Sequence, residues 1–303
     1  MGSLLKVCIL SIINGFASIA GTMGNILVCF VLYRNEELQT GVNYFILNLS
    51  VADLTVCTVA QPMYVYYLNQ EWNTRNFATF KLVSYIALHF SFSNLLLLTV
   101  NRLFAVLYSF RYGTVMRGKN VAVIVGIAWG FSAVLAIVLA ESPIQGAAPY
   151  FHLAMLLTFL TMYLKIFCIA QKKRRQIFSQ FESVSYNYRV AKVAQDYLTT
   201  RTLAILICVS VILFLPDLSL QLAGSDDYTR FYWSFTTMFL SSFLNPCVYV
   251  WRSGKFRLAL FRTFGLSRAK SRLVRRKQTK RVKFTDGAFG SLKVIDLEAL
   301  EYN

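Results

Sequence analysis

Charged residues are scarce in this sequence. They make up 15% of the 303 residues, while 56% are hydrophobic and the mean hydropathy is +0.50. A soluble domain normally carries roughly a quarter of its residues as charges, so the composition argues against a single soluble domain. Glycine (15), proline (5) and cysteine (6) are too few and too dispersed for a collagen-like chain or a disulfide framework.

Histidine is nearly absent as well, with only His89 and His152 in the whole chain. No nucleophile and base stand at a catalytic spacing, and no set of residues has the spacing of metal ligands. We therefore do not expect an enzyme. The six cysteines all fall within long apolar runs and are best interpreted as packing residues, so no extracellular disulfide is expected.

Long apolar runs dominate the sequence instead. Residues 7–33 contain no charged residue, and residues 41–69 contain only Asp53. Each run is near the roughly 20 residues that a helix needs to cross a hydrocarbon core, and none shows the alternation of a membrane β-barrel. Backbone groups in lipid must be satisfied within the segment, which favours helices. We expect an all-α membrane protein with spans at about 7–33, 42–68, 80–106, 120–140, 148–170, 201–222 and 230–251.

The basic residues indicate the orientation of these seven spans. Of the 31 Lys and Arg, only Lys6, Arg75, Lys81 and Arg230 fall on one side, and the others fall on the opposite side. By the positive-inside rule, residues 1–6 are a short extracellular N-terminus and residues 265–303 are a basic cytosolic tail. Topology and contact with anionic lipids explain the net charge of +17. Nucleic-acid binding by the tail is the minor alternative, and we expect no nucleic-acid partner.

Asp53 lies in the middle of the second span, where an ionised carboxylate costs about 2.5–3.5 kcal/mol on insertion scales. Polar residues at mid-depth of other spans could compensate, and together they could hold a cation such as sodium against Asp53. The alternative is a protonated, hydrogen-bonded aspartic acid with a structural role. The candidate partners are Asn25, Ser91, Ser241, Ser242 and Asn245.

Short motifs placed in order along the spans resemble those of rhodopsin-like (class A) G-protein-coupled receptors. They are Gly24-Asn25-x-x-Val28, Asn48-Leu-x-x-x-Asp53, Arg102, Trp129, Tyr163, Pro216 and Asn245-Pro246-x-x-Tyr249. The resemblance covers residues 7–264 and implies a seven-transmembrane helix bundle in the plasma membrane. Residues 254–264 resemble the family's short amphipathic eighth helix at the cytosolic surface. The implied partners are an extracellular ligand, a heterotrimeric G protein and membrane lipids.

The resemblance also implies roles for individual residues. Arg102 would pair at rest with Asp196 and contact the G protein in the active state. Tyr163 and Tyr249 would swing inward on activation. The acidic residue that usually precedes this arginine is replaced by Asn101, so we expect raised basal signalling. Second-messenger output equal to that of untransfected cells would count against this expectation.

The remaining switch and ion residues also follow from the resemblance. Pro216 and Pro246 each remove a helix hydrogen bond and should kink their spans, which provides pivots for a conformational change. The family's Cys-Trp-x-Pro motif reads Leu213-Phe214-Leu215-Pro216 here, so Phe214 is the only candidate for the aromatic switch. Residues that match the family's sodium pocket are Asp53, Ser91 and Asn245.

Some departures from the family resemble its melanocortin-like branch. Phe77 replaces the third-span cysteine, Met155 replaces the usual fifth-span proline, and the second outer loop is very short. The acidic third-span residues that melanocortin receptors use with calcium are not evident, which leaves a peptide ligand in question.

Candidate ligand-contacting residues lie in the outer halves of the third, sixth and seventh spans. Their aromatic content suits a lipid, a small amphiphile or a short peptide. Ser84 stands where amine receptors carry Asp, so an amine ligand is not expected. Asp217 could instead form an ion pair or a hydrogen bond within the bundle. The candidates are Lys81, Ser84, Tyr85, Leu88, His89, Asp217, Gln221, Phe235 and Phe239.

Three other functions compete with a signalling receptor. A photoreceptor needs a Schiff-base lysine in the last span, and residues 231–251 contain none. A transporter should show repeated halves, and no internal repeat is present. A non-signalling decoy or scavenger receptor is favoured by Asn101 but opposed by the retained Arg102, Tyr163 and Tyr249. We expect no cofactor apart from a sodium ion.

Overall fold

Helices account for nearly all of the chain that the structure describes. The computed structural model describes residues 2–70, 74–108, 111–141, 148–178, 185–223 and 228–265. These residues contain no strand, and the expected all-α class is confirmed. The helices are α1 (Gly2–Arg34), η1 (Glu36–Leu38), α2 (Gly41–Thr55), η2 (Val56–Ala60), α3 (Gln61–Leu68), α4 (Thr74–Leu107), α5 (Tyr112–Val115), α6 (Gly118–Glu141), α7 (Ala148–Phe178), α8 (Ser185–Leu222), α9 (Tyr228–Arg252) and α10 (Gly254–Thr263).

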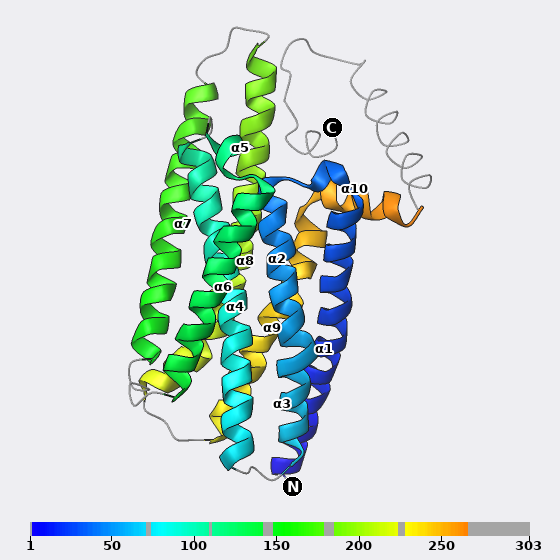
Figure 1. Cartoon of the computed structure of the whole chain (residues 1–303), viewed down its shortest axis with the longest axis vertical. Helices are drawn as coiled ribbons and strands as arrows, with labels where there is room; N and C mark the ends of the chain where they lie inside the picture. The colour runs from blue at the N-terminus through cyan, green and yellow to red at the C-terminus, as the bar shows by residue number, and fades with distance from the viewer. Residues whose placement is uncertain are drawn as a thin grey trace, which may run out of the picture.

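Hydropathy and packing identify the membrane spans in different ways. α9 has 25 residues, but its many hydroxyl and aromatic side chains lower its hydropathy, so it is not among the helices apolar enough to qualify by composition. It nevertheless packs between α1 and α8 and completes the bundle of seven helical segments (Figure 1). The stretches that qualify by length and composition among the described residues are Leu4–Arg34, Gly41–Leu68, Phe77–Leu107, Gly118–Leu139, Tyr150–Ile169 and Thr202–Leu222.

Several helices extend past the apolar runs. α1 begins at Gly2 rather than near residue 7, α7 continues to Phe178, and α8 begins at Ser185, well before the apolar run that starts near residue 201. An apolar run marks the part of a helix that can lie in hydrocarbon. The helix itself can continue into water, where its backbone hydrogen bonds persist.

The second span contains a π-helical turn, η2, between α2 and α3. Pro62 follows this turn and has no N–H to donate, so the regular hydrogen-bond ladder is broken there. Ser18 of α1 donates a hydrogen bond to the carbonyl oxygen of Cys57 at 2.7 Å, which satisfies one acceptor of the π turn. The turn begins three residues after Asp53 and shifts the phase of the side chains that follow it.

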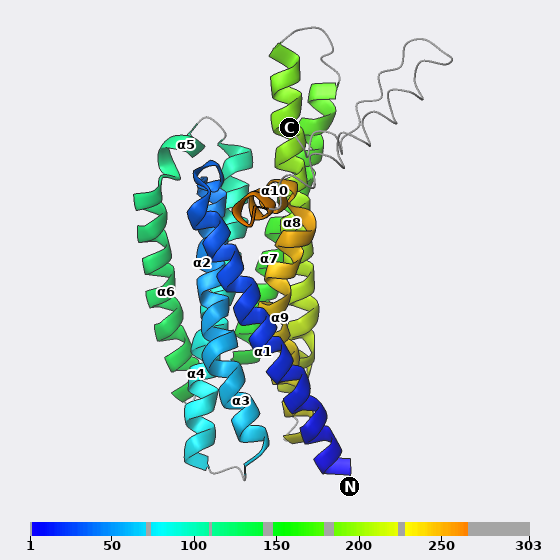
Figure 2. The same ribbon diagram turned by 90° about the vertical axis from the view of Figure 1, so that its right-hand side faces the viewer.

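The two ends of the bundle are easily distinguished. The N-terminal end of α1 lies at one end, and α10 lies across the other (Figures 1 and 2). Ser253 caps α10 by accepting a hydrogen bond from the backbone N–H of Phe256 at 3.2 Å. Phe256 and Ala259 are buried against the bundle, so α10 presents one apolar face inward, as the expected amphipathic surface helix requires.

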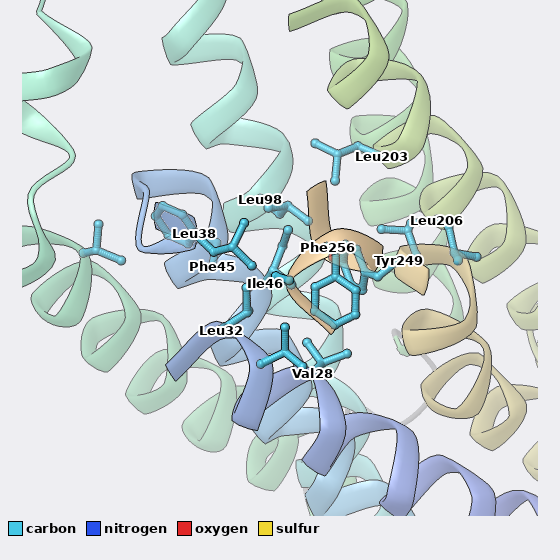
Figure 3. Packing of buried hydrophobic residues seen from close by; sticks show 14 residues of the cluster. Val28, Leu32, Leu38, Phe45, Ile46, Leu98, Leu203, Leu206, Tyr249 and Phe256 are labelled. Carbon is cyan, nitrogen blue, oxygen red and sulfur yellow. The ribbon is translucent and has the colours of Figure 1, made fainter. Parts of the chain in front are cut away.

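A hydrophobic cluster fills the α10 end of the bundle. Phe256 of α10 meets side chains from α1, α2, α4, α8 and α9 there (Figure 3). Because seven α-helices share this cluster, with Val121 contributed by α6, a displacement of α8 or α9 at this end must repack it. The cluster residues labelled in Figure 3 are Val28, Leu32, Leu38, Phe45, Ile46, Leu98, Leu203, Leu206, Tyr249 and Phe256.

Candidate functional site

Asp53 is the centre of a buried hydrogen-bonded network that joins three helices. Its side chain is fully buried in α2. Ser91 of α4 donates a hydrogen bond to Oδ1 at 2.7 Å, and Asn245 of α9 donates from Nδ2 to Oδ2 at 2.7 Å. Each carboxylate oxygen therefore has a donor, as a polar group in a membrane interior requires.

The other predicted partners of Asp53 have different contacts. Asn25 donates from Nδ2 to the carbonyl oxygens of Gly21 at 3.0 Å and Ser242 at 3.1 Å, which joins α1 to α9. Ser241 donates to the carbonyl oxygen of Met238 at 2.7 Å and does not point at the carboxylate. Ser242 Oγ and Asn25 Oδ1 are buried and make no hydrogen bond of normal geometry. Ser91 and Asn245 thus contact Asp53 with normal hydrogen-bond geometry, and Ser242 also interacts with its carboxylate.

The oxygen atoms around Asp53 match the chemistry of a hard cation. Carboxylate, hydroxyl and amide oxygens are the ligands that such ions prefer. Asp53 and Ser91 supply two of them, and Ser242 Oγ and Asn25 Oδ1 are buried oxygens still without a donor. Of the five predicted ligands, Asp53, Ser91 and Ser242 bring oxygen atoms to this point, Asn245 turns its amide nitrogen toward the carboxylate, and Ser241 is directed elsewhere.

Arg102 lies toward the α10 end of α4 and is 6% exposed. Asn101, beside it, accepts a hydrogen bond from the hydroxyl of Tyr112 at 3.1 Å. Tyr249 of α9 is buried in the hydrophobic cluster at this end, and its hydroxyl makes no hydrogen bond to any residue that the structure describes. The side chain of Asp196 lies outside the described residues.

Tyr163, Pro216 and Pro246 complete the predicted switch residues. Tyr163 of α7 is half-buried beside the apolar cluster of α4, α7 and α8. Pro216 lies inside α8, and Pro246 lies inside α9. A Cβ atom added at Gly24 of α1 would lie 2.9 Å from Cγ of Pro246, so α1 and the proline turn of α9 are in close contact.

A cavity opens among α4, α7, α8 and α9. Its volume is about 20 Å³, room for about one water molecule, so a larger ligand must displace side chains that line it. Its polar groups are few, and its remaining walls are aromatic or aliphatic. The lining residues are Tyr85, Leu88, His89, Phe92, His152, Met155, Phe214, Asp217 and Met238.

The cavity brings together four of the nine predicted ligand residues: Tyr85, Leu88, His89 and Asp217. It also includes the switch candidate Phe214, whose ring meets that of Phe92 edge-on at a centroid separation of 4.2 Å. The structure adds Phe92, His152, Met155 and Met238, which sequence reasoning did not select. The rarity of histidine was the one signal that could have indicated His152.

The other predicted ligand residues lie beside the cavity or away from it. Gln221 donates a hydrogen bond to Asp217 Oδ2, one turn back on α8. The ammonium group of Lys81 lies 5.7 Å from the ring centroid of Tyr85, and Ser84 is buried in α4. Phe235 and Phe239 are fully buried in an aromatic cluster of α3, α4 and α9, where they pack on Tyr64 and Phe80.

Comparison with known proteins finds similarity to one family of receptors. Residues 24–141 match the family model described as "7 transmembrane receptor (rhodopsin family)". The muscarinic acetylcholine receptor M3 of Rattus norvegicus is 30% identical over 133 residues, which are 43% of this chain and 23% of that receptor. The muscarinic acetylcholine receptor M1 of Homo sapiens is 34% identical over 133 residues, which are 43% of this chain and 29% of that receptor. The match thus spans less than a third of these relatives.

These relatives are not melanocortin receptors, so the comparison gives the melanocortin-like branch no support. The rhodopsin-like family itself is supported by the family match, by the helix bundle and by the motif residues Asn25, Asp53 and Arg102 within the matched segment. The helices that are long and apolar enough to cross a membrane agree with this similarity. Over residues 24–141 the chain is therefore similar to rhodopsin-like seven-transmembrane receptors.

Proposed function

We propose that this protein is a G-protein-coupled receptor, which converts binding of an extracellular ligand in the cavity into activation of a heterotrimeric G protein. The observation that supports this proposal is a row of buried polar side chains along the inside of the bundle. Asp53 is held by Ser91 and Asn245, and Tyr249, one turn after Asn245 on α9, is buried in the hydrophobic cluster at the α10 end. This row joins the helices that form the cavity to the helices that meet at the α10 end.

The orientation is part of this proposal: the N-terminus is extracellular and α10 is cytosolic. Exposed basic residues support it. The end of the bundle that carries α10, with Lys255, also holds the end of α1, with Arg34, and the start of α6, with Lys119; the start of α1, which carries Lys6, lies at the opposite end (Figure 1). An excess of Lys and Arg in short loops marks the cytosolic side.

The mechanism is a two-state equilibrium that both the ligand and the G protein bias. A ligand in the cavity would press on Phe214, which contacts Phe92 of α4. Pro216 lies two residues along α8 and interrupts its hydrogen-bond ladder, so the two halves of α8 can pivot there. Such a movement would repack the cluster around Leu203, Leu206 and Tyr249 and alter the surroundings of Arg102.

The ligand class is a small amphiphile, a lipid or a short peptide. The cavity supports a ligand with a mainly apolar body and a polar group, because Asp217 and the two histidines are grouped among aromatic and aliphatic walls. The names of the relatives suggest acetylcholine. Against an amine stands Ser84, which occupies the position of the amine-binding aspartate and does not line the cavity.

The melanocortin-like branch remains a proposal within the family. It rests on Phe77 in place of the third-span cysteine and on Met155 in place of proline. Met155 lines the cavity, so the replacement of proline by methionine at this position changes the wall that a ligand would contact.

The experiment that tests the proposed function compares the chain with its Arg102→Ala and Asn101→Asp variants in transfected cells. Because Asn101 leaves Arg102 without an adjacent carboxylate, we expect the unmodified chain to raise G-protein activity above that of untransfected cells. Arg102→Ala should abolish this signal, and Asn101→Asp should reduce it by restoring a negative charge beside the arginine. G-protein dissociation, cAMP and calcium are the readouts, at matched surface expression. A signal that survives Arg102→Ala would favour a decoy receptor or a protein that does not signal.

We propose that the sodium ion binds beside Asp53, with Ser91, Ser242 and Asn25 as further oxygen donors. The support is the pair of buried oxygens that lack a donor, Ser242 Oγ and Asn25 Oδ1. Sodium bound only to the folded state should raise the unfolding midpoint of the purified receptor, by about 2–4 °C per kcal/mol. Sodium chloride should therefore stabilise the protein more than choline chloride at equal ionic strength. Asp53→Asn should remove the difference, whereas Ser241→Ala should leave it in place.

A further inference from the structure

The only two histidines of the chain meet in the cavity. His89 lies on α4 and His152 on α7, 63 positions apart in sequence, and their ring centroids are 5.5 Å apart. Both line the same cavity. The chance that two lone histidines should meet in this way is small, which directs attention to a shared ligand.

The side chain of His89 is buried among aromatic rings beside the cavity. It is 6% exposed and contacts the rings of Tyr85, Phe151 and His152. Among the residues that the structure describes, it makes no hydrogen bond. Its ring lines the cavity, so a ligand there can reach it.

The spacing of the two rings matches that of two imidazoles on one metal ion. With a Zn–N bond of about 2.0–2.1 Å and tetrahedral angles, two such rings have centroids roughly 5 Å apart. The observed 5.5 Å needs only a small adjustment. Imidazole nitrogen is a preferred ligand of zinc and copper, whereas sodium, calcium and magnesium prefer oxygen. The two histidines therefore favour a transition-metal ion such as zinc, whereas a sodium ion is expected at Asp53.

Asp217 supplies a carboxylate at the same cavity. It lies on α8 and accepts a hydrogen bond from Gln221, which also interacts with His152. Within the described part of the chain, no three His, Cys, Asp or Glu side chains already converge on one point. The two imidazoles are thus the primary ligands, and Asp217, after rotation, or water completes the coordination. The positive charge of the ion also complements this carboxylate.

We propose that His89 and His152 bind a divalent transition-metal ion of the zinc class in this cavity and so cross-link α4 to α7. An ion that bridges two helices would bias the two-state equilibrium of the receptor and so regulate signalling. This regulatory role rests on the proposed receptor function. Binding itself does not depend on signalling. Since an imidazole must be neutral to ligate a metal, affinity should fall as the pH is lowered.

The test uses the purified full-length chain, isolated without a polyhistidine tag, and ZnCl₂ as the probe. We expect zinc to raise the unfolding midpoint in a saturable way. His89→Gln and His152→Gln should each weaken the apparent zinc affinity by about tenfold or more, because loss of an outer-shell partner alone costs about 10–100-fold. The double variant, which contains no histidine, should show no zinc-dependent shift. The exposed thiol variants Cys168→Ser and Cys208→Ser are the matched controls and should respond like the unmodified chain.

A second measurement needs no substitution. Cu²⁺ binds the same imidazole ligands as Zn²⁺ and binds them more tightly. Its electron paramagnetic resonance spectrum shows coupling to nitrogen when imidazoles ligate it. With two histidines in the chain, coupling to imidazole nitrogen assigns the site even if the variants fold poorly. A zinc shift that persists in the double variant, or a copper spectrum without nitrogen coupling, would overturn the proposal. A receptor that binds zinc but activates no G protein would overturn the proposed function and leave the metal site standing.

Discussion

Asn245→Leu is expected to destabilise the receptor by about 3 kcal/mol, because it removes the hydrogen bond to Asp53 Oδ2 and leaves a fully buried carboxylate oxygen without a donor. For a chain of this size the unfolding midpoint should fall by roughly 6–12 °C. The measurement is thermal unfolding of the purified protein, followed with a thiol-reactive dye. The six free cysteines of the chain make this dye suitable.

The combined variant Asp53→Asn/Asn245→Leu separates the charge from the loss of packing. If the cost comes from an uncompensated carboxylate, removal of the charge should restore most of the lost stability. Thr237→Val is the matched control on the same helix, because its hydroxyl bonds only to the carbonyl oxygen of Ser234 one turn back. A double variant as unstable as Asn245→Leu alone would show that Asp53 is not the group that Asn245 compensates.

The polar network illustrates how far sequence can go. Asp53 predicted a set of partners because a carboxylate in a membrane span needs compensation, and depth along the spans selected Ser91 and Asn245. The structure pairs both with Asp53. Depth alone does not give the direction of a side chain, which depends on helix rotation. Ser241 and Ser242 are adjacent in sequence, yet the first turns back to its own helix.

The cavity shows the same limit more strongly. Tyr85, Leu88 and His89 were selected from one face of α4, and they do line the cavity. Phe235 and Phe239 were selected from the same depth of α9, but that face meets α3 and α4 in a closed aromatic cluster. His152 and Met155 come from α7, whose contribution no motif indicated. Which helix faces reach a cavity is fixed by the packing of all helices together, and the sequence does not contain that information locally.

The seventh span shows a different limit. Hydropathy depends on composition, and α9 is rich in Ser, Thr and aromatic residues because it is packed between α1 and α8 rather than facing lipid broadly. The motif Asn245-Pro246-x-x-Tyr249 and the lack of charge in residues 231–251 indicated the span where the hydropathy of the helix does not. The tail at residues 266–303 lies outside the described residues, and the prediction of a basic cytosolic tail there stays a prediction.

Gly21→Ala is expected to lower the stability by about 2–3 kcal/mol, although one methyl group is the smallest change that a side chain can make. A Cβ atom at Gly21 would lie 2.6 Å from Sγ of Cys57 and 3.3 Å from Cα of Phe243. Cys57 is fully buried in the π turn, so its thiol has little room to move. Helix α1 would have to separate from both the second span and α9. Small residues allow membrane helices to approach closely in this way, and overpacking costs about 1–3 kcal/mol.

Two further variants test whether this contact is the cause. Gly15→Ala lies on the same helix with no atom within 4 Å of the added Cβ, so it should be neutral or slightly stabilising through higher helix propensity. In Gly21→Ala/Cys57→Ala the Sγ atom is gone, and the double variant should lose much less stability than the sum of the two single changes. The comparison uses unfolding midpoints in the same detergent, followed by tryptophan fluorescence because the number of thiols changes. Additive losses would mean that α1 and the π turn do not touch at this point, and the close packing that positions Asn25 beside Ser242 would need another explanation.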